Sequence, residues 1–532
     1  MKRAHLLPKS LLLVVSMSLA TAAVAQKYGG TLRGPLRANP ITASIHEESS
    51  ILTNQPFMAV FNNLVMFDQH VKMASPESIV PDLATEWSWS PDHLVLTLKL
   101  RQGVKWHDGK PFTSADVKCT WDMITGKRKS GWRRNPRGEW YSNLKETTAV
   151  GPYEVRFTLG RPQPSFMSFL AVGASPVSPC HVDGPTMRQK PIGTGPFKMV
   201  EWKSGGIVRL VKNPDYWKPG RPYLDAIEWR IVPSQATRAL SFVAGEFDLT
   251  FVGEVTPSTL KDIRAQAPKA YCETNYPGST SQILINHHMP PFDNLKVRRA
   301  VALALDRSEF VKAAQGEGRL GGIMSPPPHG AWGLTLKQLE AVPGMGKDAA
   351  RNLAEARKLM QEAGYGPKKP LKLTYILRID SGTRALTGSS ILADQMRSIW
   401  IEGDIQPMEY TMYVGAMMKG AFSMAFHGHG LALDDPDAMF YEGYKCGSIR
   451  NLTKYCNKQV EAMIDEQSAT VDLAKRKKLV HALDLFVQQD VARPIMHQDG
   501  TSSCRYPYVK GYMWGGNSNH THNRMEDLWL DK

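Results

Sequence analysis

Three motifs lie between Gly193 and Asp248 of this chain: GTGPF at 193–197, NPDYW at 213–217 and GEFD at 245–248. Glycine reaches backbone angles that are closed to other residues, so Gly193 and Gly195 predict a sharp turn into Phe197. Alternating side chains predict a strand over 207–212, which Asn213-Pro214 then ends. The pattern is that of scaffold, because these residue types do not form a catalytic set.

A second strand and a helix follow in the same segment. Residues 224–232 have the apolar content of a strand, and Ser234 can cap the helix after it. Ala236, Leu240 and Val243 recur at helical spacing, so we expect them on one face of that helix.

Residues before this segment give further local predictions. The apolar density of 57–65 favours a buried helix, and the alternation over 94–100 favours a half-buried strand. Thr113 and Asp116 have the spacing of a capping box. That box predicts a helix whose buried side chains are Val117, Trp121 and Ile124.

The order GTGPF, NPDYW, strand, helix and GEFDL resembles the family of solute-binding proteins for peptides, nickel and opines, which serve ABC importers. Two other segments are similar to the same family: WSWSPDHLVLTLKLRQGVKWHDGKPFTSADV at 87–117 and NHHMPPFDNLKVRRAVALALD at 286–306. The resemblance implies an α/β fold like that of type II periplasmic binding proteins, with two lobes, an additional second domain and a hinge. It also implies a protein that is not an enzyme and needs no cofactor. Such a protein captures a small solute, such as a peptide or a peptide-like organic ligand, and delivers it to a membrane permease with its ATPase subunits.

The first domain of that family is discontinuous. The resemblance therefore implies a first domain made of 26–66, 186–280 and 496–532, after a signal peptide at 1–25. A second domain would occupy 67–185 and a third 281–495, with the ligand between the first and third domains. We expect a monomer.

The N-terminus has the layout of a secretory signal. Basic residues precede an apolar run over 11–20, and Ala23-Val24-Ala25 ends it, so we expect cleavage before Gln26. The run is shorter than the roughly 20 apolar residues that span a membrane. No cysteine stands near the cleavage point, which argues against a lipid anchor. The sequence thus predicts a soluble periplasmic protein.

Export would place all six cysteines in an oxidising compartment. Cys446 and Cys456 bracket a glycine-containing loop, so we predict a disulfide between them. The sequence does not assign the pairing of the remaining four: Cys119, Cys180, Cys272 and Cys504. A zinc site is not predicted, because the chain has no CxxC pair.

The chain has 532 residues and a formal net charge of +15. Such an excess can attract nucleic acid or an anionic ligand. The basic residues are dispersed, however, with short clusters only at 127–129 and 475–478. A solvated basic surface therefore explains the charge without a nucleic-acid partner, and a preference for anionic ligands stays open.

Motifs that would indicate an enzyme or a metal site are weak. Residues 316–321 match GxGxxG but lack the strand before and the helix after that a dinucleotide site needs. The chain has no G-x-S-x-G, H-E-x-x-H or Walker motif, so a secreted hydrolase is a poorly supported alternative. Adjacent histidines on a strand point to opposite faces, so His287-His288 is a poor metal chelate and we interpret both as surface residues. His520 and His522 lie in a polar C-terminal tail, and we interpret them as surface residues too.

The loop from His427 to Asp437 is the most informative candidate site. Imidazoles and carboxylates crowd it: His427, His429, Asp434 and Asp435. In peptide-binding relatives, the matching loop carries a Trp and then an Asp that pairs with the ligand's α-ammonium. Aligned on Asp435-Pro436, these positions are His429 and Ala432 here. This departure favours a ligand with an anionic or neutral polar end, unless Asp434 replaces the missing carboxylate.

Two other clusters are candidates for a ligand wall. His46 and Glu47 lie in an N-terminal loop, and Trp132 and Arg133 form a second cluster with Arg134. Aromatic rings with arginines suit stacking and anion pairing, although they also occur in ordinary packing. A binding protein for chemosensing or haem delivery stays open as an alternative to import, because the sequence does not separate these roles.

Overall fold

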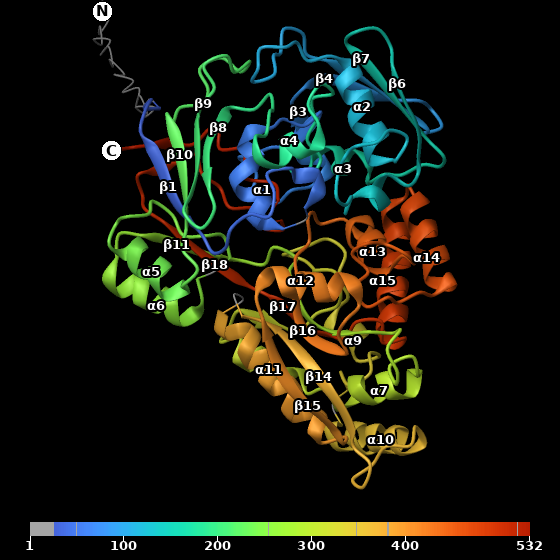
Figure 1. Ribbon diagram of the computed structural model, residues 1–532. Coiled ribbons are helices and arrows are strands. Elements are labelled where there is room, and N and C mark those ends of the chain that lie inside the picture. Colours follow the sequence, from blue (N-terminus) through green and yellow to red (C-terminus); the bar gives the residue numbers. More distant parts are fainter. Residues whose placement is uncertain (1–25, 49, 254, 347, 380–381, 519) are drawn as a thin grey trace, which may run out of the picture.

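The computed structural model describes residues 26–532 except 49, 254, 347, 380–381 and 519 (Figure 1). The predicted signal peptide therefore lies outside the described residues. Strands and helices alternate along the chain, and three sheets organise it. No helix in the described ranges is both long and apolar enough to cross a membrane.

The first sheet joins the start of the chain to the GTGPF–GEFD segment. Its order is β1 (Thr31–Leu36), β10 (Ala226–Ile231), β9 (Ile207–Lys212) and β8 (Phe197–Lys203). β1 runs parallel to β10, and the other pairs are antiparallel. The helices of this region are α1 (Ile51–Phe57), α4 (Gly184–Gln189), α5 (Gln235–Val243) and α6 (Pro257–Gln266).

A second sheet lies within 67–185. Its order is β4 (Ala84–Trp89), β5 (Val95–Leu100), β7 (Glu154–Leu159) and β6 (Leu144–Ala149). Helix α2 (Ser114–Ile124) packs on it and starts with the predicted capping box of Thr113 and Asp116. The predicted buried face of α2 is confirmed, because Val117, Trp121 and Ile124 are all buried. Helix α3 (Phe166–Ala171) and the pair β2 (Val65–Phe67) and β3 (Ile79–Pro81) complete this region.

The third sheet forms the lower lobe of Figure 1. Its order is β13 (Gly318–Arg319), β17 (Ile495–Asp499), β12 (Thr280–Ile285), β16 (Met424–His429), β14 (Leu371–Arg378) and β15 (Ile401–Met408). The helices around it are α7 (Leu295–Ala304), α8 (Arg307–Ala313), α9 (Leu336–Leu339), α10 (Ala349–Glu362), α11 (Gly382–Arg397) and α12 (Tyr410–Lys419).

Two connections pass side by side between the lobes. Strand β11 (Tyr271–Asn275) pairs with β18 (Thr501–Arg505), and these strands continue into β12 and β17. The Asp499 backbone N–H donates to the Ser279 carbonyl at 2.8 Å where the two connections cross. These two paired connections are where the chain passes from one lobe to the other. Near the C-terminus, β19 (Val509–Lys510) pairs with β20 (Trp529–Leu530).

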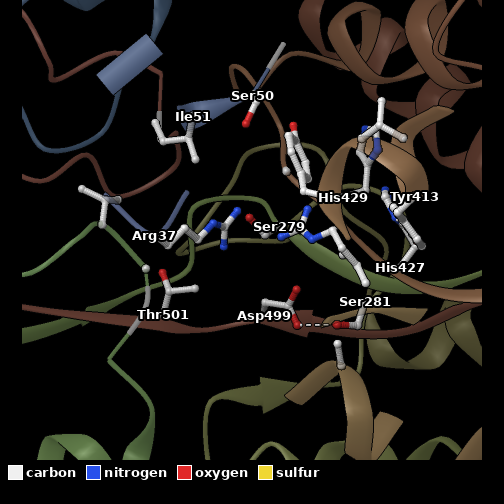
Figure 2. A pocket seen from close by; sticks show the side chains of 18 of the residues that line it. Arg37, Ser50, Ile51, Ser279, Ser281, Tyr413, His427, His429, Asp499 and Thr501 are labelled. Carbon is white, nitrogen blue, oxygen red and sulfur yellow. Dashed lines mark hydrogen bonds between the residues drawn. The ribbon is translucent and has the colours of Figure 1, made fainter. Parts of the chain in front are cut away.

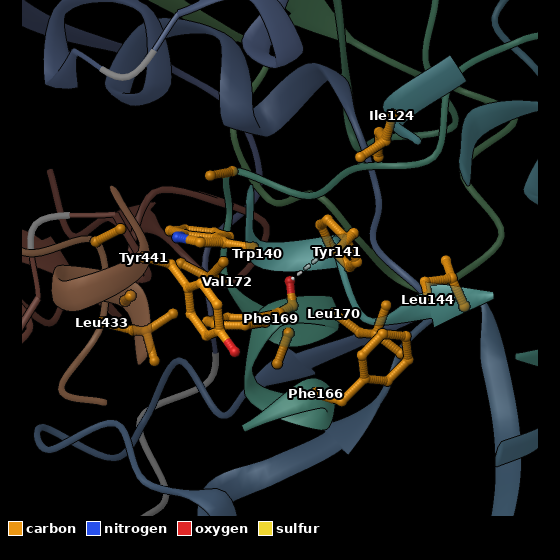
Figure 3. Close-up of a cluster of buried hydrophobic side chains, with 14 of the residues drawn as sticks. Ile124, Trp140, Tyr141, Leu144, Phe166, Phe169, Leu170, Val172, Leu433 and Tyr441 are labelled. Atoms are coloured by element: carbon orange, nitrogen blue, oxygen red, sulfur yellow. Dashed lines mark hydrogen bonds between the residues drawn. The ribbon is translucent and has the colours of Figure 1, made fainter. Parts of the chain in front are cut away.

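Three helices of the lower lobe pack against the second sheet region. They are α13 (Pro436–Tyr444), α14 (Lys458–Ala469) and α15 (Leu473–Gln489). Leu433 and Tyr441 share a buried cluster with Trp140 and Phe169 (Figure 3). The rings of Trp140 and Phe169 stack with their centres 4.8 Å apart. The Ser165 hydroxyl donates to Asp437 at 2.6 Å across this contact.

The expected helix over 57–65 is wrong. Helix α1 ends at Phe57, a 3-10 turn occupies Met58–Val60, and β2 begins at Val65. The prediction that this segment is buried is correct, because its side chains are buried. It reflects contact with the GTGPF turn rather than a helix. A Cβ on Gly193 would lie 1.9 Å from the Val60 carbonyl oxygen, and one on Gly195 2.5 Å from the Val60 carbonyl carbon.

The glycines of GTGPF therefore allow the turn to approach the Val60 backbone closely, since neither has a positive φ.

The face expected for α5 also differs from the buried one. Ala236 and Leu240 are exposed, whereas Arg238 and Phe242 are buried. Arg238 donates to the Val232 and Pro233 carbonyls at 2.7 Å, so its buried position satisfies its polar end.

All six cysteines are paired. The predicted Cys446–Cys456 disulfide is confirmed, with a Cα–Cα distance of 4.7 Å. The other pairs are Cys119–Cys180 and Cys272–Cys504, and the latter joins β11 to β18.

Candidate functional site

A cavity of about 600 Å³ lies where the lobes face each other, next to the crossing connections. Arg37 and Ile51 line it from the lobe that contains the first sheet, and Tyr413 and His427 line it from the lower lobe, which contains the third sheet (Figure 2). Thr501 lies at its floor on β18. Side chains from both lobes therefore surround one space.

Basic side chains dominate the ionised groups of the cavity wall. Among the lining residues that the structure describes, the carboxylates are Glu48 and Asp499, and the arginines are Arg37, Arg134, Arg238, Arg378 and Arg450. Arg134 pairs with Glu48. The Ser281 hydroxyl donates to Asp499 at 2.9 Å.

Two of the arginines that line the cavity pack over aromatic rings. The Arg37 guanidinium lies 5.7 Å from the Phe251 ring centre, and the Arg378 guanidinium lies 5.2 Å from that of Tyr410. A ring face attracts a cation without neutralising it, so these contacts fix the orientation of the guanidinium groups.

His427 and His429 are placed in the cavity by β16, which pairs with β12 in the centre of the sheet. The Tyr413 hydroxyl and His427 Nδ1 are 2.9 Å apart, and the two rings stack. Successive strand residues point to opposite faces, so the spacing of two places both imidazoles on the cavity side. The ring of His429 has no hydrogen-bond partner in the part of the chain that the structure describes.

Burial keeps the imidazoles of the cavity neutral. Desolvation, together with the repulsion of nearby arginines, lowers the pKa of His427 and of His520 to about 3. The pKa of His429 is also well below its usual value, first because of burial and then because of Arg450 and Arg493. Each ring therefore offers one N–H donor and one acceptor nitrogen.

Asp434 and Asp435 do not line the cavity. Asp434 accepts a hydrogen bond from the Ala331 backbone N–H at 2.9 Å, and burial raises its pKa to about 7. Asp435 forms a two-pronged pair with Arg476, at 2.8 and 3.1 Å. Ala432 is buried outside the cavity wall as well, and its carbonyl accepts from the Ser518 hydroxyl. These residues build the base of the loop.

His46, Glu47, Trp132 and Arg133 likewise lie behind the wall. His46 stacks on Trp132 at 4.9 Å, and its Nε2 is 2.7 Å from the Pro176 carbonyl oxygen. Glu47 accepts from the Arg133 backbone N–H at 2.7 Å and from Arg188. Glu48, which follows Glu47, and Arg134, which follows Arg133, line the cavity instead. The structure thus places neighbours of the predicted residues, rather than the predicted side chains, in the cavity wall.

The expectation that His520 and His522 are surface residues is wrong, because both are buried. The Thr521 hydroxyl contacts His522 Nδ1, and His522 Nε2 is 2.9 Å from the Val71 carbonyl oxygen. His520 lines the cavity. Its polar neighbours in sequence suggested a solvated tail, so no local signal identified it. His288 is exposed and His287 half-buried.

Arg450 is a second residue that sequence reasoning missed. It lies in the loop closed by Cys446–Cys456, together with Ile449 and Leu452, which also line the cavity. The disulfide was predicted, and the position of its loop was not. Within the described ranges, no group of three or more His, Cys, Asp or Glu side chains has the geometry of a metal site.

Comparisons with known proteins identify the family of this chain. Residues 78–451 match the family model of bacterial extracellular solute-binding proteins, family 5. The glutathione-binding protein GsiB of Escherichia coli is 26% identical over 474 residues, which cover 85% of this chain and 86% of GsiB. Di/tripeptide-binding protein 3 of Pseudomonas aeruginosa is 27% identical over 468 residues, which cover 83% and 84%.

Solved structures show the same fold. DppA from Helicobacter pylori, in complex with the peptide STSA, has a TM-score of 0.83 at 24% identity, covering 95% of this chain and 99% of DppA. AgaA from A. tumefaciens, in complex with agropinic acid, has a TM-score of 0.80 at 23% identity, covering 94% and 99%.

Proposed function

The chain belongs to family 5 of the bacterial extracellular solute-binding proteins, and on this premise we propose that it captures a small solute in the cavity between its lobes and delivers it to the permease of an ABC importer. The observation that carries the proposal is the cavity itself. Its volume lies within the range of about 300–1,000 Å³ of small-molecule sites, and both lobes line it.

Closure of the lobes supplies the mechanism. A ligand between the lobes makes its full set of contacts only in the closed state, so binding shifts the population from open to closed. The paired connections β11–β12 and β17–β18 are the segment about which the lobes rotate. Covalent chemistry is not required, which agrees with a family of binding proteins.

The ligand proposed is a peptide or a peptide-like organic solute. GsiB and the di/tripeptide-binding proteins carry such ligands in their names, and they cover most of this chain. We also propose a first domain of 26–66, 186–280 and 496–532, a second of 67–185 and a third of 281–495. The three sheets favour such a division, although β17 (Ile495–Asp499) pairs within the third sheet and β2 (Val65–Phe67) begins before residue 67. We further propose export with cleavage before Gln26, a periplasmic monomer without a lipid anchor, and the permease with its ATPase subunits as partners.

Small-angle scattering of the mature protein tests the capture of a solute. Solute extracted from gently purified protein, identified by mass spectrometry and added back, is expected to reduce the radius of gyration and raise the Tm. A chemosensing role predicts the same closure. ATPase stimulation of the cognate permease in proteoliposomes separates the two roles, because only an import component stimulates it. Turnover of the solute would favour a hydrolase instead.

A further inference from the structure

Three arginines surround a single buried carboxylate behind the cavity wall. Glu442, on α13, pairs with both Arg137 and Arg450. Arg493 donates to the Arg450 carbonyl at 3.1 Å and lies over the ring of Tyr444. No carboxylate of the described chain lies within ion-pair distance of Arg493. One negative charge therefore faces three positive charges.

This excess of positive charge is buried. Arg137 and Arg493 are each 1% exposed, and Glu442 is 3% exposed. Burial lowers the pKa of both arginines, repulsion from Arg450 adds to the lowering, and the attraction of Glu442 offsets it only in part. The next acid, Glu48, is already paired with Arg134. Because an uncompensated buried charge is costly, a negative group brought to this cluster would be stabilised strongly.

The cluster reaches the cavity at one corner. Arg450 lines the cavity, and so do His429 and His520. Arg450 and Arg137 both lower the pKa of both imidazoles through charge repulsion, in keeping with the shared position of Arg450, His429 and His520 in the cavity wall. We call His429, Arg450 and His520 the anion corner.

The anion corner also has unused hydrogen-bonding capacity. Nδ1 of His520 is buried and has no hydrogen-bond partner within the described ranges, and the same holds for the hydroxyl of Thr501 on the cavity floor. Buried polar atoms nearly always have partners in native proteins, so unpartnered ones that line a cavity indicate where a ligand binds. Neutral imidazoles can donate to an oxyanion beside the Arg450 guanidinium.

We propose that the anion corner binds a carboxylate of the ligand, so that the solute is an organic acid or a peptide recognised by its acid end, and a free ammonium is not required there. This inference rests on the proposed solute-binding function and names its ligand class. An ammonium at the same corner would lie beside Arg450, with the buried excess of positive charge of Arg137 and Arg493 behind it. A phosphate shares the required oxyanion chemistry, and the test below separates the two.

Calorimetry with matched probes tests the inference. The probes are Ala-Ala, N-acetyl-Ala-Ala, Ala-Ala amide, succinate, citrate and inorganic phosphate. We expect binding of acids, little loss on N-acetylation, and a loss of about tenfold to a hundredfold when the carboxylate becomes an amide. Tight binding of phosphate with inert carboxylates would overturn the carboxylate assignment. So would an amide that binds as well as its acid, or no binding by any acid at millimolar concentration.

Matched variants locate the binding. Arg450→Gln is expected to weaken the best acid by about tenfold or more and to leave the amide unchanged. Arg450→Lys, which keeps the charge, should restore part of the affinity. Arg156→Gln is the control, because Arg156 is an exposed arginine on β7 that pairs with Glu154 on its own strand. Thermal unfolding in the absence of ligand confirms that each variant is folded. Equal losses in Arg450→Gln and Arg156→Gln would overturn the inference.

The two proposals fail in different ways. If a neutral or cationic solute closes the lobes in scattering while no acid does, the solute-binding function stands and the anion corner is wrong. If no solute of any charge closes the lobes, the proposed function itself is wrong.

Discussion

At the scale of single residues, Asp434 shows how burial changes a carboxyl group. Burial raises its pKa to about 7, whereas an unfolded Asp titrates near 4. As the pH rises, the Asp434 carboxyl group therefore loses its proton at a lower pH in the unfolded protein than in the folded protein. The contribution of Asp434 to stability therefore falls between about pH 4 and pH 7, and ionisation opposes folding above that window.

Asp434→Asn removes this penalty while retaining an acceptor for the Ala331 N–H. We expect its stability relative to the parent protein to increase from pH 5 to pH 8 by at least about 1 kcal/mol. Urea unfolding at both pH values measures this difference. Ligand affinity should not change, because Asp434 does not line the cavity. An equal effect at both pH values would show that Asp434 ionises normally.

The imidazoles of the cavity lead to a second prediction at this scale. The pKa values of His427 and His520 are both lowered to about 3 by burial, so neither ring gains a proton at pH 5.5. The affinity for a ligand that is itself fully ionised should thus differ by less than about threefold between pH 5.5 and pH 8. Calorimetry at the two pH values checks this expectation. A change of tenfold or more would indicate that an imidazole titrates.

At the scale of elements, we expect the loop from Cys446 to Cys456 to contribute both to the stability of the fold and to ligand binding. The disulfide closes a short loop that presents Arg450 to the cavity. Replacing both cysteines with serine should cost roughly 2–4 kcal/mol of stability and also weaken ligand binding, because the loop loses its fixed shape. Calorimetry and thermal unfolding measure the two effects.

The Cys119–Cys180 pair provides the matched control. Neither cysteine lines the cavity, so the corresponding double serine variant should lose stability and keep its affinity. Equal affinities in both variants would show that the disulfide does not position Arg450.

Elements set by local pattern could be predicted from the sequence, and the cavity could not. Strand β5 and helix α2 follow from alternation and a capping box within a few residues. The segment 57–65 was predicted wrongly, because apolar density alone does not distinguish a helix from buried extended chain. The cavity combines Arg37, just after β1, with β16, the Cys446–Cys456 loop and β18, and hundreds of residues separate Arg37 from the other three. Of its lining residues, His427 and His429 stood out in a local pattern as ligand-binding candidates, and Arg134 was noted beside such candidates.

At the scale of the whole molecule, the contact between 67–185 and α13–α15 is a second place where the lobes meet. Arg161 donates to Asp465 at 3.1 Å and to Ser468 at 3.2 Å across this contact, away from the cavity. If the contact forms on closure, Arg161→Ala destabilises the closed state and lowers affinity by about threefold to tenfold without touching the ligand. Arg156→Ala is the control. Equal affinities would show that the two segments move as one body.

The pairing of β11 with β18 has a consequence for biogenesis. A chain that is oxidised as it emerges would join its cysteines in consecutive pairs, giving Cys272 to Cys446 and Cys456 to Cys504. The native pairs are Cys446–Cys456 and Cys272–Cys504, and the latter spans 232 residues. The Cys272 thiol must therefore wait until almost the entire chain has arrived, or a wrong bridge must be exchanged. Maturation of this protein should thus depend on a disulfide isomerase rather than on an oxidase alone.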